Sequence, residues 1–282
     1  MFENIFQNVP LFIIYAITAG ALSSIAFGIV GSIVVIKRIT YITGAISHII
    51  LGGIGLSLFI NYYYGQNWFS PILGSIIIAS LSAVIIHYLK TYQSQREDSI
   101  ISVLWAIGMS IGLILISKIP GYIDINTYLF GNILLVSVED IYLLLIWDIF
   151  LVIAIILFYY KIIAISFDEE FCKSKNINTN VYNCGFLIIT AITIVFLIKI
   201  VGIILSIALF VIPAATISCF VNKIWQIIFF SIILCLLFII IGFQISYQYD
   251  IPSGSTIVII SSIIYLLSNL FVKIVKLTVK RT

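Results

Sequence analysis

Long apolar runs alternate with short polar segments along the whole chain. Nine runs are present, at 11 to 36, 42 to 60, 71 to 89, 99 to 117, 141 to 160, 184 to 198, 200 to 220, 224 to 246 and 256 to 272. Each approaches or exceeds the roughly 20 residues that an α-helix needs to cross a hydrocarbon core of about 30 Å. Lipid offers the backbone no hydrogen-bond partners, and the alternating segments of a barrel are missing. We therefore predict an all-α polytopic membrane protein with about nine helices, or eight if the runs beside Lys199 fuse.

Composition supports a single transmembrane domain over residues 1–282. Hydrophobic residues make up 62% of the chain and charged residues only 9%, a balance that a soluble domain of this size does not have. The longest polar loops, at about 118–140 and 161–183, are too short to hold a further domain. Short loops exclude a receptor with a large domain outside the membrane. A redox or proteolytic membrane enzyme is also excluded, because the apolar runs hold no cluster of His, Cys or carboxylate residues.

Basic residues fall on alternate sides of the runs, which predicts the orientation. Cytoplasmic loops retain positive charge, so the side richer in Lys and Arg is the inner one. If the chain starts outside, the outer segments hold only Lys118 and Lys199. The inner segments then hold Lys37, Arg38, Lys90, Arg96, Lys161, Lys173, Lys175, Lys223, Lys273, Lys276, Lys280 and Arg281. We predict an outer amino end and an inner carboxyl end. The net charge of +3 reflects this arrangement, so nucleic acid is not an expected partner.

His48 is the histidine placed deepest in an apolar run. It lies about eight residues inside the second run, roughly 12 Å along a helix, which is near the midplane of the membrane. Gly44, Gly52 and Gly55 share its helix face. Ionisable groups in a span indicate a substrate path, and neutral imidazole is a common metal ligand. A satisfied hydrogen bond between helices is the alternative for His48.

Two other residues inside apolar runs are chemically unusual. Asp148 is a second buried charge, at a depth similar to that of His48, and it either completes a metal site or pairs with Lys199. Pro213 removes one backbone hydrogen bond from the seventh run, which predicts a kink or break unless neighbouring groups restore the pairing. A broken helix at membrane depth usually lines a cavity, and a packing kink is the alternative.

The inner loop at 161–183 has the features of a short docking helix. Ser166 and Glu169 form an S-x-x-E pattern, typical of a capping box, and Asp168, Glu169 and Glu170 favour a helix start. Phe167 and Phe171 are one turn apart and would share an aromatic face. Such a helix either docks in a groove of a partner or lies on lipid headgroups. The chain has no G-x-x-x-x-G-K-[ST] loop, so ATP-driven transport would need a separate hydrolysing subunit.

A series of motifs in a fixed order resembles the permease subunits of bacterial ABC transporters that import zinc, manganese or iron(II), the ABC-3 family. The motifs are Lys37-Arg-Ile-Thr-Tyr41, Ser47-His48 followed by Gly52, Asp124 with Tyr128-Leu-Phe-Gly131, Glu139-Asp140, Phe167-Asp168-Glu-Glu170, Val201-Gly202, Ile212-Pro-Ala-Ala-Thr216 and Pro252-Ser-Gly254. Each motif is weak alone, and their order and spacing over nearly the whole chain make the resemblance specific.

The resemblance implies a non-catalytic permease in the bacterial cytoplasmic membrane. It implies a homodimer of the permease and two cytoplasmic ATPase subunits docked on Phe167–Phe171. It also implies an extracytoplasmic binding protein that delivers the metal. The divalent ion is then substrate, with no permanent cofactor. The family's second-helix motif makes His48 the expected ligand, with Asp148 as a second candidate. Gly44 replaces the family's Asp, and Glu169 replaces its Pro, which supports the capping box and leaves docking intact.

Outer carboxylates would favour cation entry by giving the outer face a negative potential. These are Asp124, Glu139, Asp140 and Asp250. Two other classes of transporter remain open. A secondary transporter driven by an ion gradient would show coupling carboxylates and an inverted repeat, and an ABC permease for a metal chelate would need a wider path without a ligating histidine.

Overall fold

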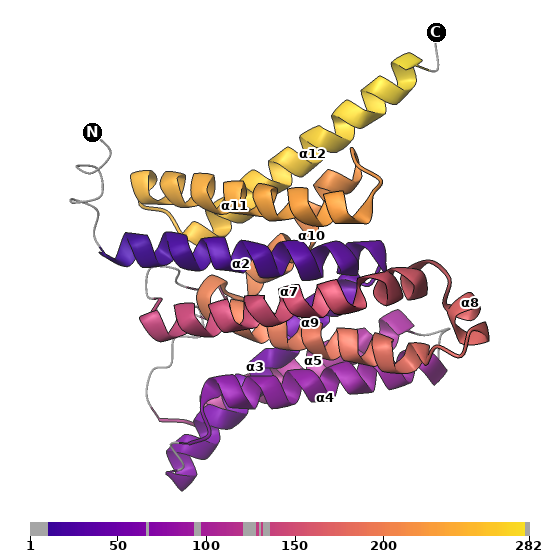
Figure 1. Ribbon diagram of the computed structural model, residues 1–282. Coiled ribbons are helices and arrows are strands. Elements are labelled where there is room, and N and C mark those ends of the chain that lie inside the picture. Colours follow the sequence, from indigo (N-terminus) through magenta and orange to yellow (C-terminus); the bar gives the residue numbers. More distant parts are fainter. Residues whose placement is uncertain are drawn as a thin grey trace. The chain divides into compact units, whose positions relative to one another are not determined.

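The computed structural model describes residues 11–65, 68–92, 97–120, 128–129, 131 and 136–279. Ten helices account for nearly all the regular structure in these residues. They are α2 (Leu11–Ile36), α3 (Thr40–Tyr64), α4 (Pro71–Tyr92), α5 (Glu97–Ser117), α7 (Val138–Phe167), α8 (Glu169–Ser174), α9 (Thr179–Val201), α10 (Ile203–Ser218), α11 (Ile224–Tyr249) and α12 (Ser253–Val279) (Figure 1). Eight of them are long and apolar enough to cross a membrane, and α10 is a shorter apolar helix of 16 residues. The predicted all-α polytopic fold is confirmed.

The first of two compact units contains α2, the first part of α7, α10, α11 and α12. It comprises Met1–Arg38, Asn126–Ile156 and Lys199–Thr282. Helix α2 packs against α10 and α11, and α12 packs against the same two helices (Figure 1). The Phe27 and Phe210 rings meet edge to face, with centroids 5.0 Å apart, and both are fully buried. Gly31 allows the approach of α10, because a Cβ there would lie 2.4 Å from the Phe210 carbonyl oxygen.

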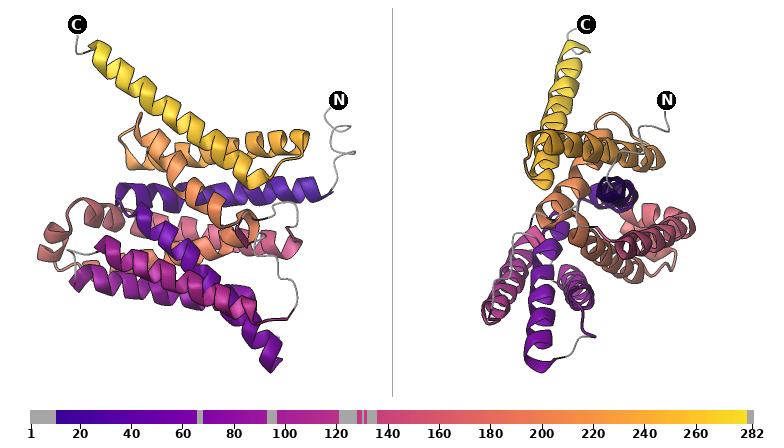
Figure 2. Two further views of the ribbon diagram at one scale, coloured as in Figure 1. Left: turned by 180° about the vertical axis from the view of Figure 1, so that it is seen from behind. Right: turned by 90° about the vertical axis from the view of Figure 1, so that its left-hand side faces the viewer.

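The second unit is organised around α3, which packs against both α4 and α5. It comprises Ile39–Ile125 and Leu157–Ile198. The three helices lie side by side in both views of Figure 2. A Cβ on Gly52 would lie 2.8 Å from the carbonyl oxygen of Gly108, and a Cβ on Gly55 would lie 2.6 Å from that of Gly112. The residue numbers of the contact positions increase in the same direction along both helices. Helices α3 and α5 therefore run parallel, with their backbones in contact.

The chain breaks at Gly202, between α9 and α10. The φ angle of Gly202 is +84°, in the region that favours glycine. Gly131, with a φ of +66°, lies against this break, because a Cβ there would be 2.3 Å from the Val201 carbonyl carbon. The Ser206 hydroxyl donates to the Gly202 carbonyl oxygen at 2.7 Å. The runs on either side of Lys199 are therefore separate helices, and two of the motifs from the sequence meet at their junction.

Of the kink or break that we expected at Pro213, the break is wrong, and the kink stays a prediction. Helix α10 continues from Ile203 to Ser218 with Pro213 inside it. A proline in a helix interior costs about 3 kcal/mol, through a lost hydrogen bond and a clash with the preceding turn. Packing of α10 on α2, α11 and α12 holds the helix together at this point. Pro213 and Ala214 are both buried in that packing.

We predict that Gly55→Ala destabilises the protein, because its Cβ would enter the backbone of α5. Forcing extra atoms into a packed contact costs about 1–3 kcal/mol. Gly185→Ala in α9 is the matched control, since a Cβ there meets no atom within 4 Å. In thermal unfolding of the purified protein, Gly55→Ala should melt earlier than the wild type, and Gly185→Ala at the same temperature or later. Equal melting of Gly55→Ala and wild type would contradict the close contact of α3 and α5.

Candidate functional site

The His48 imidazole stacks on the indole of Trp105. Their ring centroids are 4.6 Å apart and the rings are 18° from parallel. His48 comes from α3 and Trp105 from α5, both in the second unit. Each ring lies about one turn before a glycine of the α3–α5 contact, His48 before Gly52 and Trp105 before Gly108. The backbone approach of the two helices therefore places the two rings face to face.

The Nδ1 atom of His48 is buried and has no hydrogen-bond partner in the described part of the chain. A buried polar atom without a partner costs roughly 1–3 kcal/mol, so such atoms are rare in native structures. Imidazole nitrogen is also a preferred ligand for divalent transition metals. An ion bound at Nδ1 would supply the missing partner, so this atom has the properties of a transient metal ligand.

Space is open beside His48 at Gly44, one helical turn earlier. A Cβ added to Gly44 would meet no atom within 4 Å. Gly52 and Gly55 on the same face are instead closed by α5. The α3 face around His48 is therefore closed after the histidine and open before it.

Asp148 is the second predicted ligand, and it lies in the first unit. It is ten residues into α7, about 15 Å along the helix axis, and its side chain is only 4% exposed. Neither of its carboxylate oxygens has a partner among the described residues. Lys199, the alternative partner, binds Asp140 instead. Within the residues that the structure describes, no three His, Cys, Asp or Glu side chains gather as a preformed metal site.

The four carboxylates that we expected at the outer face differ in their surroundings. Asp140 is buried and receives hydrogen bonds from the Ser137 hydroxyl at 2.8 Å and the Ser137 backbone N–H at 3.2 Å. The Asp140 N–H donates in return to Ser137 Oγ at 3.3 Å, so the pair forms a capping box at the start of α7. Lys199 completes this cluster by pairing with Asp140. Glu139 is exposed, as is Asp250, which ends α11 with a φ of +52°. Asp124 lies outside the described residues.

Asp168 is the N-cap of the short helix α8, and the capping box that we predicted for Ser166 and Glu169 is wrong. The Asp168 side chain accepts the Phe171 N–H at 2.8 Å. Helix α7 extends to Phe167, so Ser166 lies in its last turn and donates to the Ile162 carbonyl oxygen at 2.5 Å. The apolar residues before Ser166 continue α7 through Phe167, past the position where the capping pattern placed the start of the next helix.

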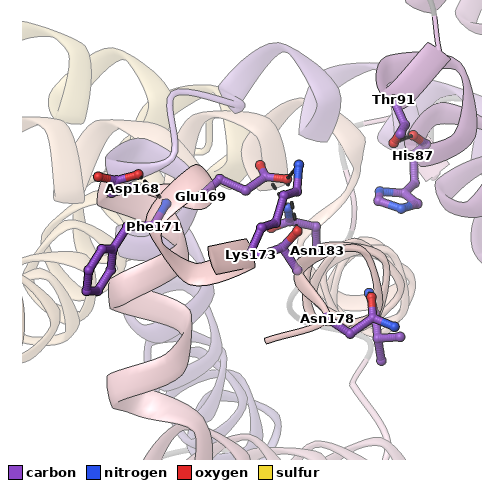
Figure 3. A network of polar contacts seen from close by, with 10 residues as sticks. His87, Thr91, Asp168, Glu169, Phe171, Lys173, Asn178 and Asn183 are labelled. Carbon is purple, nitrogen blue, oxygen red and sulfur yellow. Dashed lines mark hydrogen bonds and ion pairs between the residues drawn. The ribbon is translucent and has the colours of Figure 1, made fainter. Parts of the chain in front are cut away.

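Glu169, the first residue of α8, contacts α9 and also forms an ion pair within α8 (Figure 3). It accepts the Thr179 hydroxyl at 3.1 Å and the Asn183 amide at 3.4 Å. It also pairs with Lys173 at 2.8 Å, and this hydrogen bond raises the pKa of Lys173. Cys172 is buried beneath the helix. A helix of six residues is marginal alone, so these contacts hold it in place.

Two aromatic side chains are exposed around α8. Phe167 is 74% exposed and Phe171 is 57% exposed. They do not share one helix face as we expected, because Phe167 ends α7 and Phe171 belongs to α8. Lys175 lies 5.8 Å from the centroid of the Phe171 ring. The turn between the helices therefore presents two large apolar rings beside the exposed carboxylates of Asp168 and Glu170.

Sequence reasoning missed the partner of His48 and the true caps. The spacing Gly108-x-x-x-Gly112 is typical of close helix packing in membranes and could have identified α5 as the neighbour of α3. Asp168 is as good an N-cap residue as serine, and Ser137 with Asp140 also has the capping spacing. The stack on Trp105 had no sequence signal, because it depends on the register of two helices.

A comparison with protein families gives a match over residues 11–272 to the ABC 3 transport family. The match begins with α2 and ends within α12. The chain belongs to the ABC 3 transport family. It is a multi-pass membrane permease of the kind that the motifs predicted, and that prediction is confirmed.

Relatives in the ABC 3 transport family carry descriptions of metal transport. A probable metal transport system membrane protein of Chlamydia trachomatis is 38% identical, over 88% of this chain and 85% of its own. The high-affinity zinc uptake system membrane protein ZnuB of Buchnera aphidicola is 30% identical, over 89% of this chain and 95% of its own. The manganese import system permease protein ScaB of Streptococcus parasanguinis is 29% identical, over 89% and 87%.

The fold is shared with a solved structure. The structure of PsaBC from Streptococcus pneumoniae in complex with Fab matches with a TM-score of 0.81 and 26% sequence identity. The match covers 95% of this chain and 94% of that one. The arrangement of helices described above is therefore that of a permease of the ABC 3 transport family.

We predict that Asp168→Ala loosens α8, because it removes the acceptor of the Phe171 N–H. Loss of an N-cap side chain costs about 1 kcal/mol. Amide hydrogen exchange of residues 169–174 should quicken in Asp168→Ala. Asp168→Asn should keep the wild-type rate, since asparagine caps equally well, and Glu170→Gln serves as a control on the same helix. Unchanged exchange in Asp168→Ala would show that contacts to α9 alone hold α8.

Proposed function

We propose that this permease carries a divalent transition-metal ion, zinc or manganese, into the cytoplasm as part of an ABC importer. The observation that carries the proposal is the buried, unpartnered Nδ1 of His48 on a glycine-lined face of a transmembrane helix. The descriptions of the manganese and zinc relatives support the same class of substrate. Iron(II) has similar ligand preferences and belongs in the same uptake assay.

A single imidazole suits a site that must release its ion. A hydrated divalent cation has to exchange water for protein ligands, and a complete cage of ligands would hold it permanently. Asp148, buried with both oxygens unpartnered, is the second candidate ligand. The open space at Gly44 leaves room for the ion to keep water beside His48. Two ATP-driven conformations then expose the path outward and inward in turn.

The permease works with other subunits in this proposal. A homodimer of the permease forms the path, and an extracytoplasmic metal-binding protein delivers the ion to it. Two ATP-binding subunits hydrolyse ATP, since the permease sequence has no phosphate-binding loop. The exposed rings of Phe167 and Phe171 beside the capped helix α8 support docking of those subunits here. Outer carboxylates such as Glu139 and Asp250 attract the cation.

The orientation completes the proposal. The excess of Lys and Arg in one set of loops supports an amino end outside the cell and a carboxyl end in the cytoplasm.

We predict that a reporter active only in the cytoplasm is active when fused after Lys90, Lys223 or Thr282. The same reporter should be inactive after Asn67. Activity after Asn67 and its loss after Thr282 would reverse the orientation.

We predict that His48→Ala abolishes metal uptake while the permease still reaches the membrane and binds its ATPase. The change removes a ligand but little packing volume. Uptake of radioactive zinc, manganese and iron should be measured beside the amount of permease in the membrane. His87→Ala is the matched control, because His87 is the other histidine of the chain and lies at the cytoplasmic end of α4. Normal uptake of all three metals by His48→Ala would remove this residue from the path.

We also predict that Phe171→Ala weakens association with the ATPase. Truncation of an aromatic side chain at the centre of an interface costs about 2 kcal/mol or more, which corresponds to roughly 30-fold in affinity. Phe167→Ala should act in the same direction. Phe229→Ala on α11 is the control, since its ring is 55% exposed within a transmembrane helix. Copurification of the ATPase at wild-type yield with both α8-region variants would mean that these rings lie on lipid.

A further inference from the structure

The stack between His48 and Trp105 fixes the plane of the imidazole. The two rings are 18° from parallel with centroids 4.6 Å apart, so the indole covers one face of the histidine ring. Helix packing favours this geometry, because the glycine contacts bring the backbones of α3 and α5 together one turn after the two rings. The close approach of the two backbones therefore places Trp105 within stacking distance of His48.

No hydrogen bond to either ring nitrogen of His48 is present among the described residues. In most metal sites the ring nitrogen that does not bind the ion donates to a carboxylate or carbonyl, and this bond orients the ligand. In this protein the stack on Trp105 orients the His48 ring in place of such a hydrogen bond. The lone pair with which neutral imidazole binds a metal lies in the ring plane. When Nδ1 is the unprotonated nitrogen, a fixed ring plane also fixes the direction from which a cation can reach it.

A stack on the face of the His48 ring occupies neither ring nitrogen, whereas a hydrogen bond would occupy one of them. Coordination of a cation draws electron density from imidazole, and an electron-rich indole face then attracts the ring more strongly. The contact is therefore stronger when the ion is bound, although the indole itself contributes no ligand atom. Trp105 keeps 42% of its surface exposed, so it is not buried as a core residue would be.

We propose that Trp105 is a positioning residue for the transported metal, holding the His48 imidazole in the orientation that binds the ion. This inference rests on the proposed role of His48 as a metal ligand. It extends that proposal from one ligand to the aromatic pair formed by α3 and α5.

The test is manganese binding to the purified permease in complex with its ATPase, without the extracytoplasmic binding protein. Electron paramagnetic resonance of free Mn²⁺ gives the dissociation constant, and zinc competition extends the measurement to Zn²⁺. Trp105→Leu should raise the dissociation constant about three- to tenfold, the loss expected for one aromatic stack. Trp105→Phe should stay within about twofold of the wild type, because a phenyl ring still stacks. Trp225→Leu, which replaces an indole that is 56% exposed at the start of α11, should bind as the wild type.

Two comparisons decide the result. In a His48→Ala background, Trp105→Leu should have no further effect on the dissociation constant. Equal binding by Trp105→Leu and the wild type, or equal weakening by leucine and phenylalanine, would overturn the positioning role. If His48→Ala itself binds manganese normally, the ligand assignment fails. Loss of binding in His48→Ala with wild-type binding in Trp105→Leu defeats only the inference about the tryptophan. Thermal unfolding of each variant separates these outcomes from a folding defect. If leucine prevents folding, Trp105→Ile carries the test, because it also removes the aromatic ring and should weaken binding to the same extent.

Discussion

Backbone contact between α3 and α5 is the constraint on which the site depends. Lipid tails are as apolar as the helices, so burial of apolar surface does not drive helices together inside a membrane. Close van der Waals packing does, and glycine permits it by letting two backbones touch. Gly52 with Gly108 and Gly55 with Gly112 provide this contact. The same contact sets the register that places His48 on Trp105.

His48 lies at this helix contact with a buried ring nitrogen that lacks a hydrogen bond among the described residues. A histidine between helices usually gains a hydrogen bond, yet Nδ1 of His48 is buried without one in the described part of the chain. In the proposed function, this unsatisfied atom binds the incoming cation and, as a single imidazole, releases it again. Asp148 has the same character in the other unit, as a buried carboxylate without a partner among the described residues. In contrast, Asp140 is neutralised by Lys199 and by the cap of α7, which suits a structural role.

The sequence predicted the helices well because their signal is local. Apolar length alone identified every long helix, and the separate helices beside Lys199 agree with nine apolar segments. Features that depend on neighbours were less accessible. Pro213 stays within α10 because packing offsets the lost hydrogen bond, and Asp168 caps α8 because α7 continues through Ser166. His48 could be selected from depth and spacing, whereas its stack on Trp105 required the relative position of two helices.

Direct observation of the histidine nitrogens on addition of zinc tests the central claim. The chain has two histidines, His48 and His87, so a protein labelled with ¹⁵N-histidine gives few imidazole signals. Solid-state NMR of the assembled transporter in lipid can follow them, with His87→Ala used to assign the spectrum. Our account predicts that zinc shifts the Nδ1 resonance of His48 and leaves His87 unchanged. An unchanged His48 resonance at zinc concentrations that support transport would contradict it.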